Sequence, residues 1–309
     1  MSLLDKFYGV LIGCAVGDAI GELASGHQDK HSLEEWLSKG DILRYTDDTA
    51  MSIGLVESIL EKQSIDEDSI GKKFQTNYSK EPWRAYSPST PNIFARVKRQ
   101  GITYSKAAEQ LYDGEGSLGN GASMRIAPIG ILYNNSPELL KFAELSARVT
   151  HSHPIAIDGA LSMSYAISVL SSLNYVDSFP LDKFCTGLIK VCKTKEMKNN
   201  YLIIFEALAS KTNPSDVAKI INLSQKAHES VPFAVYSFLK NKDSFKDSLF
   251  CAILNGGDQD TLGAMTSSLS GAFLGKEAIP DKWINQIENL DYISSLSNKL
   301  FKLHGRINL

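Results

Sequence analysis

The feature that most restricts how this chain can fold is a glycine at every fourth position of its first long apolar segment. Residues 3–24 repeat apolar side chains at helical spacing, so we expect one helix over this range. Positions four apart lie on one face of a helix, and glycines leave that face without side chains. The spacing predicts tight core packing in which another helix approaches closely along Gly9, Gly13, Gly17 and Gly21. Asp18 and Glu22 would share a face near the end of the same helix.

Further helical patterns fill most of the chain, and no segment shows the alternation of apolar and polar residues that is typical of a strand. We expect a short helix over residues 33–37 capped by Ser32, and a later one with Pro232 in its first turn. The longer helices are expected over residues 50–60, 66–79, 103–112, 136–150, 155–173, 181–192, 202–209, 245–255 and 262–274. No linker rich in Pro, Gly or Ser divides the chain, so we predict an all-α protein of about a dozen helices, with residues 1–309 forming a single domain.

The composition excludes several classes of protein. The 309 residues are 43% hydrophobic and 22% charged, with a formal net charge of −3. Lys and Arg are scattered and the pI is near 6.1, so no nucleic-acid partner is indicated. No apolar run reaches the roughly 18 residues that a membrane span needs, and we expect no membrane partner. The four cysteines have no CxxC spacing, which favours reduced thiols and a cytoplasmic location.

Two acidic turns carry the strongest chemical signal. Residues 255–262 place Asp258, Asp260 and Thr261 on a glycine-introduced turn ahead of a helix, and residues 45–49 read Tyr-Thr-Asp-Asp-Thr ahead of another. Asp and Thr are also favoured helix caps, so capping explains each turn about as well as function does. Taken together, the carboxylates and hydroxyls form an all-oxygen set, which suits Mg²⁺, Mn²⁺ or Ca²⁺ rather than zinc. Four converging carboxylates would repel one another without a cation.

Three other segments are candidates for ligand contact. Residues 112–124 are rich in glycine and could offer backbone amides to a phosphate, although they lack the spacing of either nucleotide-binding fingerprint and a plain loop is equally consistent. The Pro-rich residues 81–91 form a loop in which Trp83 and Tyr86 are either packing anchors or a substrate wall. His151 and His153 lack partners for a zinc site, and we expect His151 to contact a ligand or serve a structural role.

Five segments resemble the ADP-ribosylhydrolase family, in family order and over roughly residues 7–275. They are Gly-Cys-Ala-Val-Gly-Asp-Ala-Ile-Gly (13–21), Tyr-Thr-Asp-Asp-Thr-Ala-Met (45–51), Gly-Asn-Gly-Ala-Ser-Met-Arg (119–125), Thr-His (150–151) and Gly-Gly-Asp-Gln-Asp-Thr-Leu-Gly-Ala-Met (256–265). The tract from the Pro-rich loop to Gly-Asn-Gly, and Glu-Ser-Val-Pro at 229–232, look closest to the branch that cleaves serine-linked ADP-ribose.

The resemblance implies a compact all-α orthogonal bundle that hydrolyses the bond at C1 of the distal ribose in ADP-ribose conjugates. The conjugates would be protein-linked ADP-ribose, poly-ADP-ribose or O-acetyl-ADP-ribose, bound by a monomer. Two Mg²⁺ ions, for which Mn²⁺ can substitute, would be held by Thr46, Asp47, Asp48, Asp258, Asp260 and Thr261. The implied substrate-binding residues are Gly116, Ser117, Leu118, Gly119, Asn120, Gly121, Ser123, Met124 and His151.

The implied catalytic residues include one departure from the family pattern. Asp47, Asp48 and Asp260 match the motifs, but the family often carries a Glu seven residues after the Asp of the Gly-Asp pair, and here that position is Ser25. Glu22 is the nearest acid and is the candidate for its role. Leu118 is a second departure, because the serine-linked branch tends to place an aromatic residue there.

Three alternatives remain open at this level. The chain could hold ADP-ribose without turning it over, a reading that Ser25 motivates. It could be a different di-metal hydrolase, such as a phosphodiesterase, or a purely structural protein, although nothing structural requires four converging aspartates.

Overall fold

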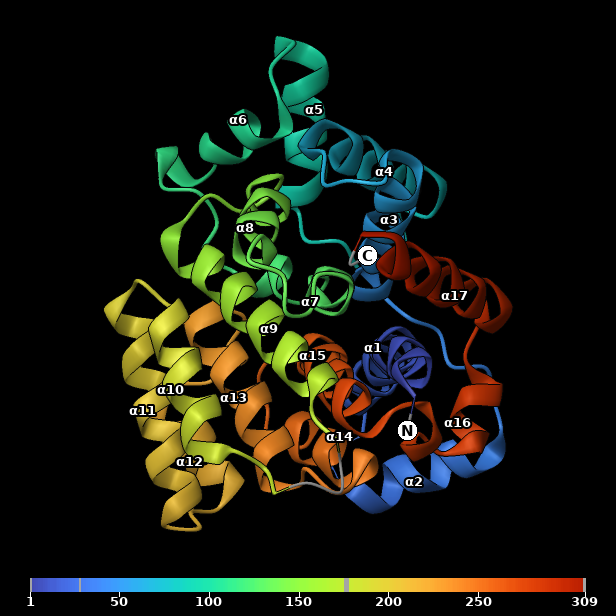
Figure 1. The fold of residues 1–309 in the computed structure, drawn as a ribbon, viewed down its shortest axis with the longest axis vertical. Helices are drawn as coiled ribbons and strands as arrows, with labels where there is room; N and C mark the ends of the chain where they lie inside the picture. Colours follow the sequence, from blue (N-terminus) through green and yellow to red (C-terminus); the bar gives the residue numbers. More distant parts are fainter. Residues whose placement is uncertain (1, 28, 175–177, 308–309) are drawn as a thin grey trace.

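The computed structural model describes residues 2–27, 29–174 and 178–307, and these residues form seventeen α-helices, three short 3₁₀ helices and no strand (Figure 1). The first helices are α1 (Leu3–Ala24), α2 (Lys30–Lys39), α3 (Asp47–Lys62), α4 (Glu67–Lys80), α5 (Ser89–Gln100), α6 (Tyr104–Glu109), α7 (Ala127–Leu132), α8 (Leu139–Arg148) and α9 (Pro154–Ser172). They are followed by α10 (Leu181–Val191), α11 (Lys195–Ala209), α12 (Pro214–Ile220), α13 (Ala227–Lys240), α14 (Phe245–Ile253), α15 (Gln259–Leu274), α16 (Asp281–Gln286) and α17 (Leu290–Ile307). The 3₁₀ helices are η1 (Tyr112–Gly114), η2 (Asn120–Ala122) and η3 (Lys276–Ala278). The predicted all-α fold is confirmed, with more helices than expected.

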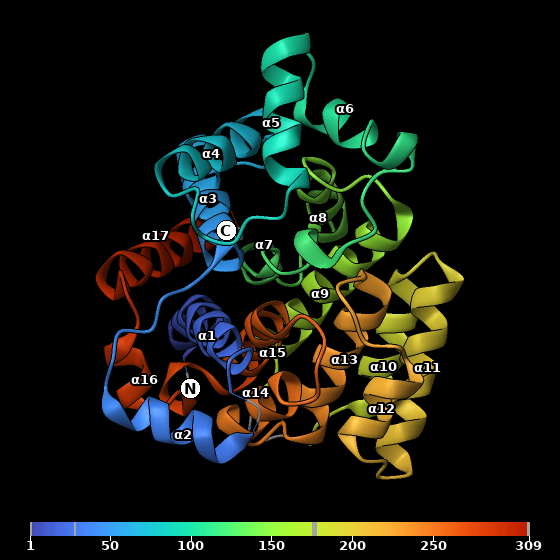
Figure 2. The same cartoon turned by 180° about the vertical axis from the view of Figure 1, so that it is seen from behind.

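Helices α1 and α15 lie side by side at the centre of the bundle in both views (Figures 1 and 2). The glycines of α1 face α15 along its whole length, because a Cβ atom built on Gly13 would lie 2.7 Å from the carbonyl oxygen of Ser267. Built on Gly17 or Gly21, a Cβ atom would collide with the backbone of Gly263 or Gln259. The predicted close approach is therefore confirmed, and its partner is the helix that follows the second acidic turn.

Several helix boundaries differ from the expectations, for local reasons. Helix α2 begins at Lys30 rather than at residue 33, because Asp29 and not Ser32 is its cap and accepts a hydrogen bond from the Ser32 amide at 2.9 Å. Helix α13 begins at Ala227, so Pro232 lies in its second turn. Proline removes the helical donor to the carbonyl four residues earlier, and the Asn200 side chain donates to that carbonyl, on His228, at 2.6 Å.

Two helices, α1 and α9, are by length and composition apolar enough to cross a membrane, contrary to the expectation that no such stretch exists. In each of them 83% of the apolar window is buried inside the protein. Burial on nearly all faces accounts for this composition, since a helix surrounded by other helices has no polar face. The buried apolar side chains of the described residues form one cluster to which α1, α9 and α15 all contribute. The single domain stays a prediction.

Candidate active site

The two acidic turns lie at the N-terminal ends of α3 and α15, and in the described structure neither Thr46 nor Asp258 caps its helix through the side chain. Instead, the carboxylate of Asp258 accepts hydrogen bonds from the side-chain amides of Asn120 at 2.9 Å and Gln225 at 3.3 Å. The Thr46 hydroxyl donates to carboxylates of other residues. Capping therefore does not explain these two side chains, whose hydrogen-bond partners are other side chains.

Asp18, between Gly17 and Gly21 on α1, holds the first acidic turn. Its fully buried carboxylate accepts hydrogen bonds from the amides and hydroxyls of Thr46 and Thr49, with donor–acceptor distances between 2.6 and 3.1 Å. Burial raises the pKa of Asp18 to about 6, although the hydrogen bonds from Thr49 and Thr46 act in the opposite direction. The sequence placed Asp18 in a family motif but gave it no role.

The carboxylates of the site repel one another. Burial raises the pKa of Asp47 and of Asp48 well above the usual range, and the nearby charges of Asp18 and Asp260 raise both further. Burial and the neighbouring Asp258 raise the pKa of Asp260 to about 7. The shifts follow from several carboxylates lying close together in a region that is largely buried from solvent.

A divalent cation fits this environment chemically. The donors are all oxygen atoms, and the buried Oδ1 of Asp48 has no hydrogen-bond partner in the described structure. However, no three His, Cys, Asp or Glu side chains among the described residues are gathered closely enough to hold a metal ion as they stand. The set therefore fits a cation by composition and charge, and its side chains do not form a closed ligand shell in this structure.

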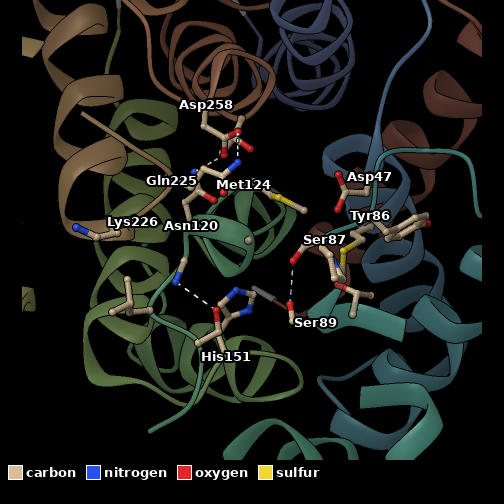
Figure 3. A pocket seen from close by; sticks show the side chains of 18 of the residues that line it. Asp47, Tyr86, Ser87, Ser89, Asn120, Met124, His151, Gln225, Lys226 and Asp258 are labelled. Atoms are coloured by element: carbon tan, nitrogen blue, oxygen red, sulfur yellow. Dashed lines mark hydrogen bonds between the residues drawn. The ribbon is translucent and has the colours of Figure 1, made fainter. Parts of the chain in front are cut away.

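A cavity of about 860 Å³ opens beside the acidic turns (Figure 3). Asp258 lies on one side with Asn120 and Gln225, whereas Asp47 lies on the other side beside Tyr86. The predicted site residues that line the cavity are Asp47, Asp258, Asp260, Thr261, Gly116, Ser117, Leu118, Gly119, Asn120, Gly121, Met124 and His151. The fold thus brings most of the predicted metal and substrate residues to a single cavity.

The glycine-rich segment is held firmly along one wall of this cavity. The Asn120 amide donates to the carbonyl of Gln225 at 3.0 Å, and the Ala227 amide donates to the carbonyl of Leu118 at 3.1 Å. Gly116 has a φ of +75°, and a Cβ atom there would lie 2.9 Å from the amide nitrogen of His153. Glycine is therefore required at this position for both conformation and space. The segment therefore forms a structured wall of the cavity, held by hydrogen bonds and close packing, and is not a plain surface loop.

His151 is neutral and is hydrogen-bonded through Nδ1. Burial lowers its pKa to about 3, and the charge of Arg125 lowers it further. Arg125 donates to the Thr150 hydroxyl at 2.7 Å, and that hydroxyl lies 2.7 Å from Nδ1 of His151. Because an arginine can only donate, the Thr150 oxygen accepts from Arg125, and the Thr150 proton is available for Nδ1. When Thr150 donates to Nδ1, the ring proton of His151 is on Nε2, which faces the glycine wall at Gly119 and Gly121.

Four predicted site residues do not line the cavity. Thr46 and Asp48 are buried behind it. Ser123 is also buried and its side chain faces α9, since a Cβ atom on Gly159 would lie 2.5 Å from its Oγ. Glu22 is exposed near the end of α1, and the exposed Ser25 donates its hydroxyl proton to the Glu22 carbonyl at 2.7 Å.

Other lining residues were missed or left undecided by the sequence. Tyr86 packs on Tyr78, with ring centroids 5.1 Å apart, and it also lines the cavity; its contact with a substrate stays a prediction. Trp83 is 71% exposed and does not line the cavity. The missed lining residues include Tyr112, Glu115, Arg125, His153, Gln225 and Lys226. Arg125 was within a quoted motif, whereas Gln225 and Lys226 carry no sequence signal.

Known proteins are similar to this chain over nearly its whole length. An ADP-ribosylhydrolase ARH3 from Xenopus tropicalis is 28% identical over 98% of this chain and 97% of its own length. An uncharacterized protein from Archaeoglobus fulgidus is 30% identical over 98% of each chain. The ADP-ribosyl-[dinitrogen reductase] glycohydrolase of Rhodospirillum rubrum is 26% identical over 93% of this chain and 92% of its own.

The fold and the family are both established by two further matches. A solved structure described as an ADP-ribosylglycohydrolase-related protein complex shares the fold, with a TM-score of 0.73 at 21% identity over 98% of this chain and 99% of its own. The family model described as ADP-ribosylglycohydrolase matches residues 1–308. The suspected resemblance is confirmed, and the chain belongs to the ADP-ribosylglycohydrolase family.

Proposed function

We propose that this protein is a Mg²⁺-dependent hydrolase that cleaves the bond at C1 of the distal ribose in ADP-ribose conjugates. The observation that carries the proposal is the single cavity in which the aspartates at the starts of α3 and α15 share the space with the glycine wall and the neutral His151. ADP-ribose has matching chemistry, with a diphosphate for backbone amides and ribose hydroxyls for an oxygen-rich cation site. Candidate substrates are protein-linked ADP-ribose, poly-ADP-ribose and O-acetyl-ADP-ribose.

The cation would be held by Thr46, Asp47, Asp48, Asp258, Asp260 and Thr261, with two Mg²⁺ ions balancing the four carboxylates and Mn²⁺ able to substitute. When bound, the ions supply positive charge that binds ribose hydroxyls and favours ionisation of a water molecule. Support comes from the raised pKa values of Asp47, Asp48 and Asp260, each caused first by burial and then by neighbouring carboxylates.

The remaining groups bind and orient the substrate. The glycine wall, residues 116–121, lies against the diphosphate, and Nε2–H of His151 donates a hydrogen bond beside it. Hydrolysis breaks the bond from C1 to the linked group, adds the oxygen of water to C1 and returns a proton to the leaving group. An aspartate of the site accepts the proton of the water, and Glu22 is the candidate acid for the leaving group.

A second candidate function is ADP-ribose binding with weak or no turnover, and Ser25 favours it. Ser25 is exposed at the end of α1, and its hydroxyl is bonded to a backbone carbonyl rather than directed at the cavity. No acid occupies this position, so the proton for the leaving group has to come from elsewhere. ADP-ribose binding without product release, unchanged in Ser25→Glu, would favour this second function over hydrolysis.

The test is release of ADP-ribose from serine-linked, arginine-linked and poly-ADP-ribose substrates in parallel, with Mg²⁺ or with chelator. We expect release from at least one substrate that chelator abolishes, and a loss on the order of 100-fold or more in Asp47→Asn and Asp258→Asn. The matched control is Asp216→Asn, the same change at an exposed position on α12, which should leave the rate unchanged. No release from any of the substrates would refute the hydrolase.

We also propose that the protein acts as a cytoplasmic monomer. All four cysteines lie in the described residues and are free thiols, and burial raises the pKa of Cys14 to about 12. Unreactive buried thiols are compatible with a reducing compartment. Size-exclusion chromatography with light scattering tests the oligomeric state, and a mass of twice 33.9 kDa would overturn the proposed monomer.

A further inference from the structure

Asp18 lies outside the cavity but contacts the turn that carries half of the candidate metal ligands. Its Oδ1 accepts from the amide and hydroxyl of Thr46 at 3.0 and 2.8 Å. Its Oδ2 accepts from the amide and hydroxyl of Thr49 at 3.0 and 2.6 Å. Each oxygen is thus occupied by two donors from the start of α3, so this carboxylate is committed to hydrogen bonding within the protein.

The bond from Thr46 determines which way its hydroxyl oxygen is presented. A hydroxyl has one proton, and the Thr46 oxygen is 2.8 Å from Asp18 but 3.2 Å from Asp48. When Thr46 donates its hydroxyl proton to Asp18, the lone pairs of the Thr46 oxygen stay free. The Asp48 carboxylate then does not accept this hydrogen bond. An oxygen ligand binds a cation through a lone pair, so Asp18 selects the hydroxyl orientation that can ligate.

The position of Asp18 is itself fixed by helix packing. Its neighbour Gly17 packs on Gly263, and a Cβ atom on Gly21 would lie 2.7 Å from the Cα atom of Asp260. Helix α1 therefore cannot shift relative to the start of α15 without a collision. Through Asp18, the same helix holds the start of α3, so one rigid element sets the spacing between the two acidic turns.

We propose that Asp18 is a positioning residue of the divalent-cation site: it orients the Thr46 hydroxyl and fixes residues 46–49 against α15 without ligating the cation. This role rests on the proposed function, because it presumes that the acidic turns bind a cation. Partners that orient metal ligands in this way typically contribute 10–100-fold to metal affinity.

The chain supplies a matched control in Asp158 on α9. This carboxylate is also buried, and it accepts from the amide and hydroxyl of Thr194 at 2.6 and 2.7 Å and from the Lys193 amide at 2.8 Å. It therefore anchors a threonine turn with the same chemistry, but it does not line the cavity. Asp18→Asn and Asp158→Asn remove comparable hydrogen bonds, and only the first should affect a cation.

The experiment is a titration of the full chain with Mn²⁺, in which free Mn²⁺ is measured by electron paramagnetic resonance, together with urea unfolding of each variant. We expect both variants to lose stability, and only Asp18→Asn to weaken Mn²⁺ binding, by about 10–100-fold. Unchanged binding in Asp18→Asn, or an equal loss in Asp158→Asn, would overturn the positioning role. A wild-type chain that binds neither Mn²⁺ nor Mg²⁺ would instead overturn the metal-dependent function.

Thr49→Val keeps the proposal testable if Asp18→Asn does not fold. Thr49 is buried, donates its hydroxyl proton to Asp18 and is not a candidate ligand, and valine has nearly its shape. We expect a smaller loss of Mn²⁺ affinity than for Asp18→Asn, of about tenfold. A Thr49→Val chain that binds Mn²⁺ like the wild type would count against the positioning role.

Discussion

Asp258 and His151 show how single side chains in the cavity are fixed by partners far away in the sequence. Asp258 accepts hydrogen bonds from Asn120 and Gln225, so the second acidic turn is tied to the glycine wall as well as to its own helix. His151 depends on a chain of bonds that begins at the fully buried Arg125 and passes through Thr150. Each arrangement assigns donor and acceptor roles that the residue types alone leave open.

The neutral state of His151 makes stability depend on pH. Its folded pKa of about 3 is below the usual 6.5, so between these values the unfolded chain binds a proton that the folded chain does not. The contribution of His151 to the free energy of unfolding is therefore fully present above pH 6.5. It is lost as the pH is lowered toward 3, by on the order of 1.4 kcal/mol per pH unit. Urea unfolding should show that this acid-side loss is smaller in His151→Gln than in the wild type. Parallel pH profiles would contradict a buried neutral imidazole.

At the scale of the helices, sequence periodicity located most elements but missed α5, α7, α12, α16 and α17. Helix α17 had a readable signal, since its buried residues Ile293, Leu296, Leu300 and Leu303 recur at helical spacing. Helix α5 was obscured because its first turn, residues 89–91, belongs to the Pro-rich stretch that was predicted to be a loop. The glycine spacing of α1 predicted a close helix contact correctly, but it could not name α15 as the partner, because any helix with a small-residue face would satisfy it.

The glycine contact between α1 and α15 can be tested with one substitution at two positions. Gly17→Ala should lower the free energy of unfolding by about 1–3 kcal/mol, because the added methyl group meets the Gly263 backbone. Gly305→Ala on α17 is the control: nothing lies within 4 Å of a Cβ atom there, so it should raise stability by up to about 1 kcal/mol. Chemical denaturation measures both, and a neutral or stabilising Gly17→Ala would show that the helices are less tightly packed.

At the scale of the whole molecule, a buried arginine connects three separate segments next to the site. Arg84 donates to Glu288 at 2.5 Å, to the Tyr45 carbonyl at 2.7 Å and to Glu81 at 2.9 Å. It also stacks on the Tyr45 ring, 3.9 Å from its centroid. The C-terminal part of the chain is thereby tied to the residue that precedes the first acidic turn and to the loop that carries Tyr86.

Removing Glu288 should loosen this connection. Glu288→Ala leaves the Arg84 guanidinium with fewer acceptors and also removes the acceptor of the Tyr45 amide, so we expect a loss of about 1–3 kcal/mol in unfolding free energy. In the same variant, KM for an ADP-ribose conjugate should rise more than kcat falls, because Tyr86 forms a wall of the cavity. The exposed Glu277→Ala serves as control for both readouts. If Glu288→Ala has the kinetics and the stability of the wild type, the hydrogen bonds to Glu81 are enough to hold Arg84 in place.

The sequence by itself determined the helical class, the close packing along α1 and the oxygen chemistry of the two acidic turns, because these follow from residue type and spacing over short stretches. Only the tertiary structure decided that α15 is the partner of α1, that Asp18 holds the first acidic turn, and that Gln225, Lys226 and Tyr112 line the same cavity as Asp47. Such relations depend on which distant faces bury each other, and helical periodicity defines an apolar face without specifying its partner. Ser25 shows the same limit at one residue: the sequence revealed the missing acid, but the packing at the end of α1 placed its hydroxyl on a backbone carbonyl.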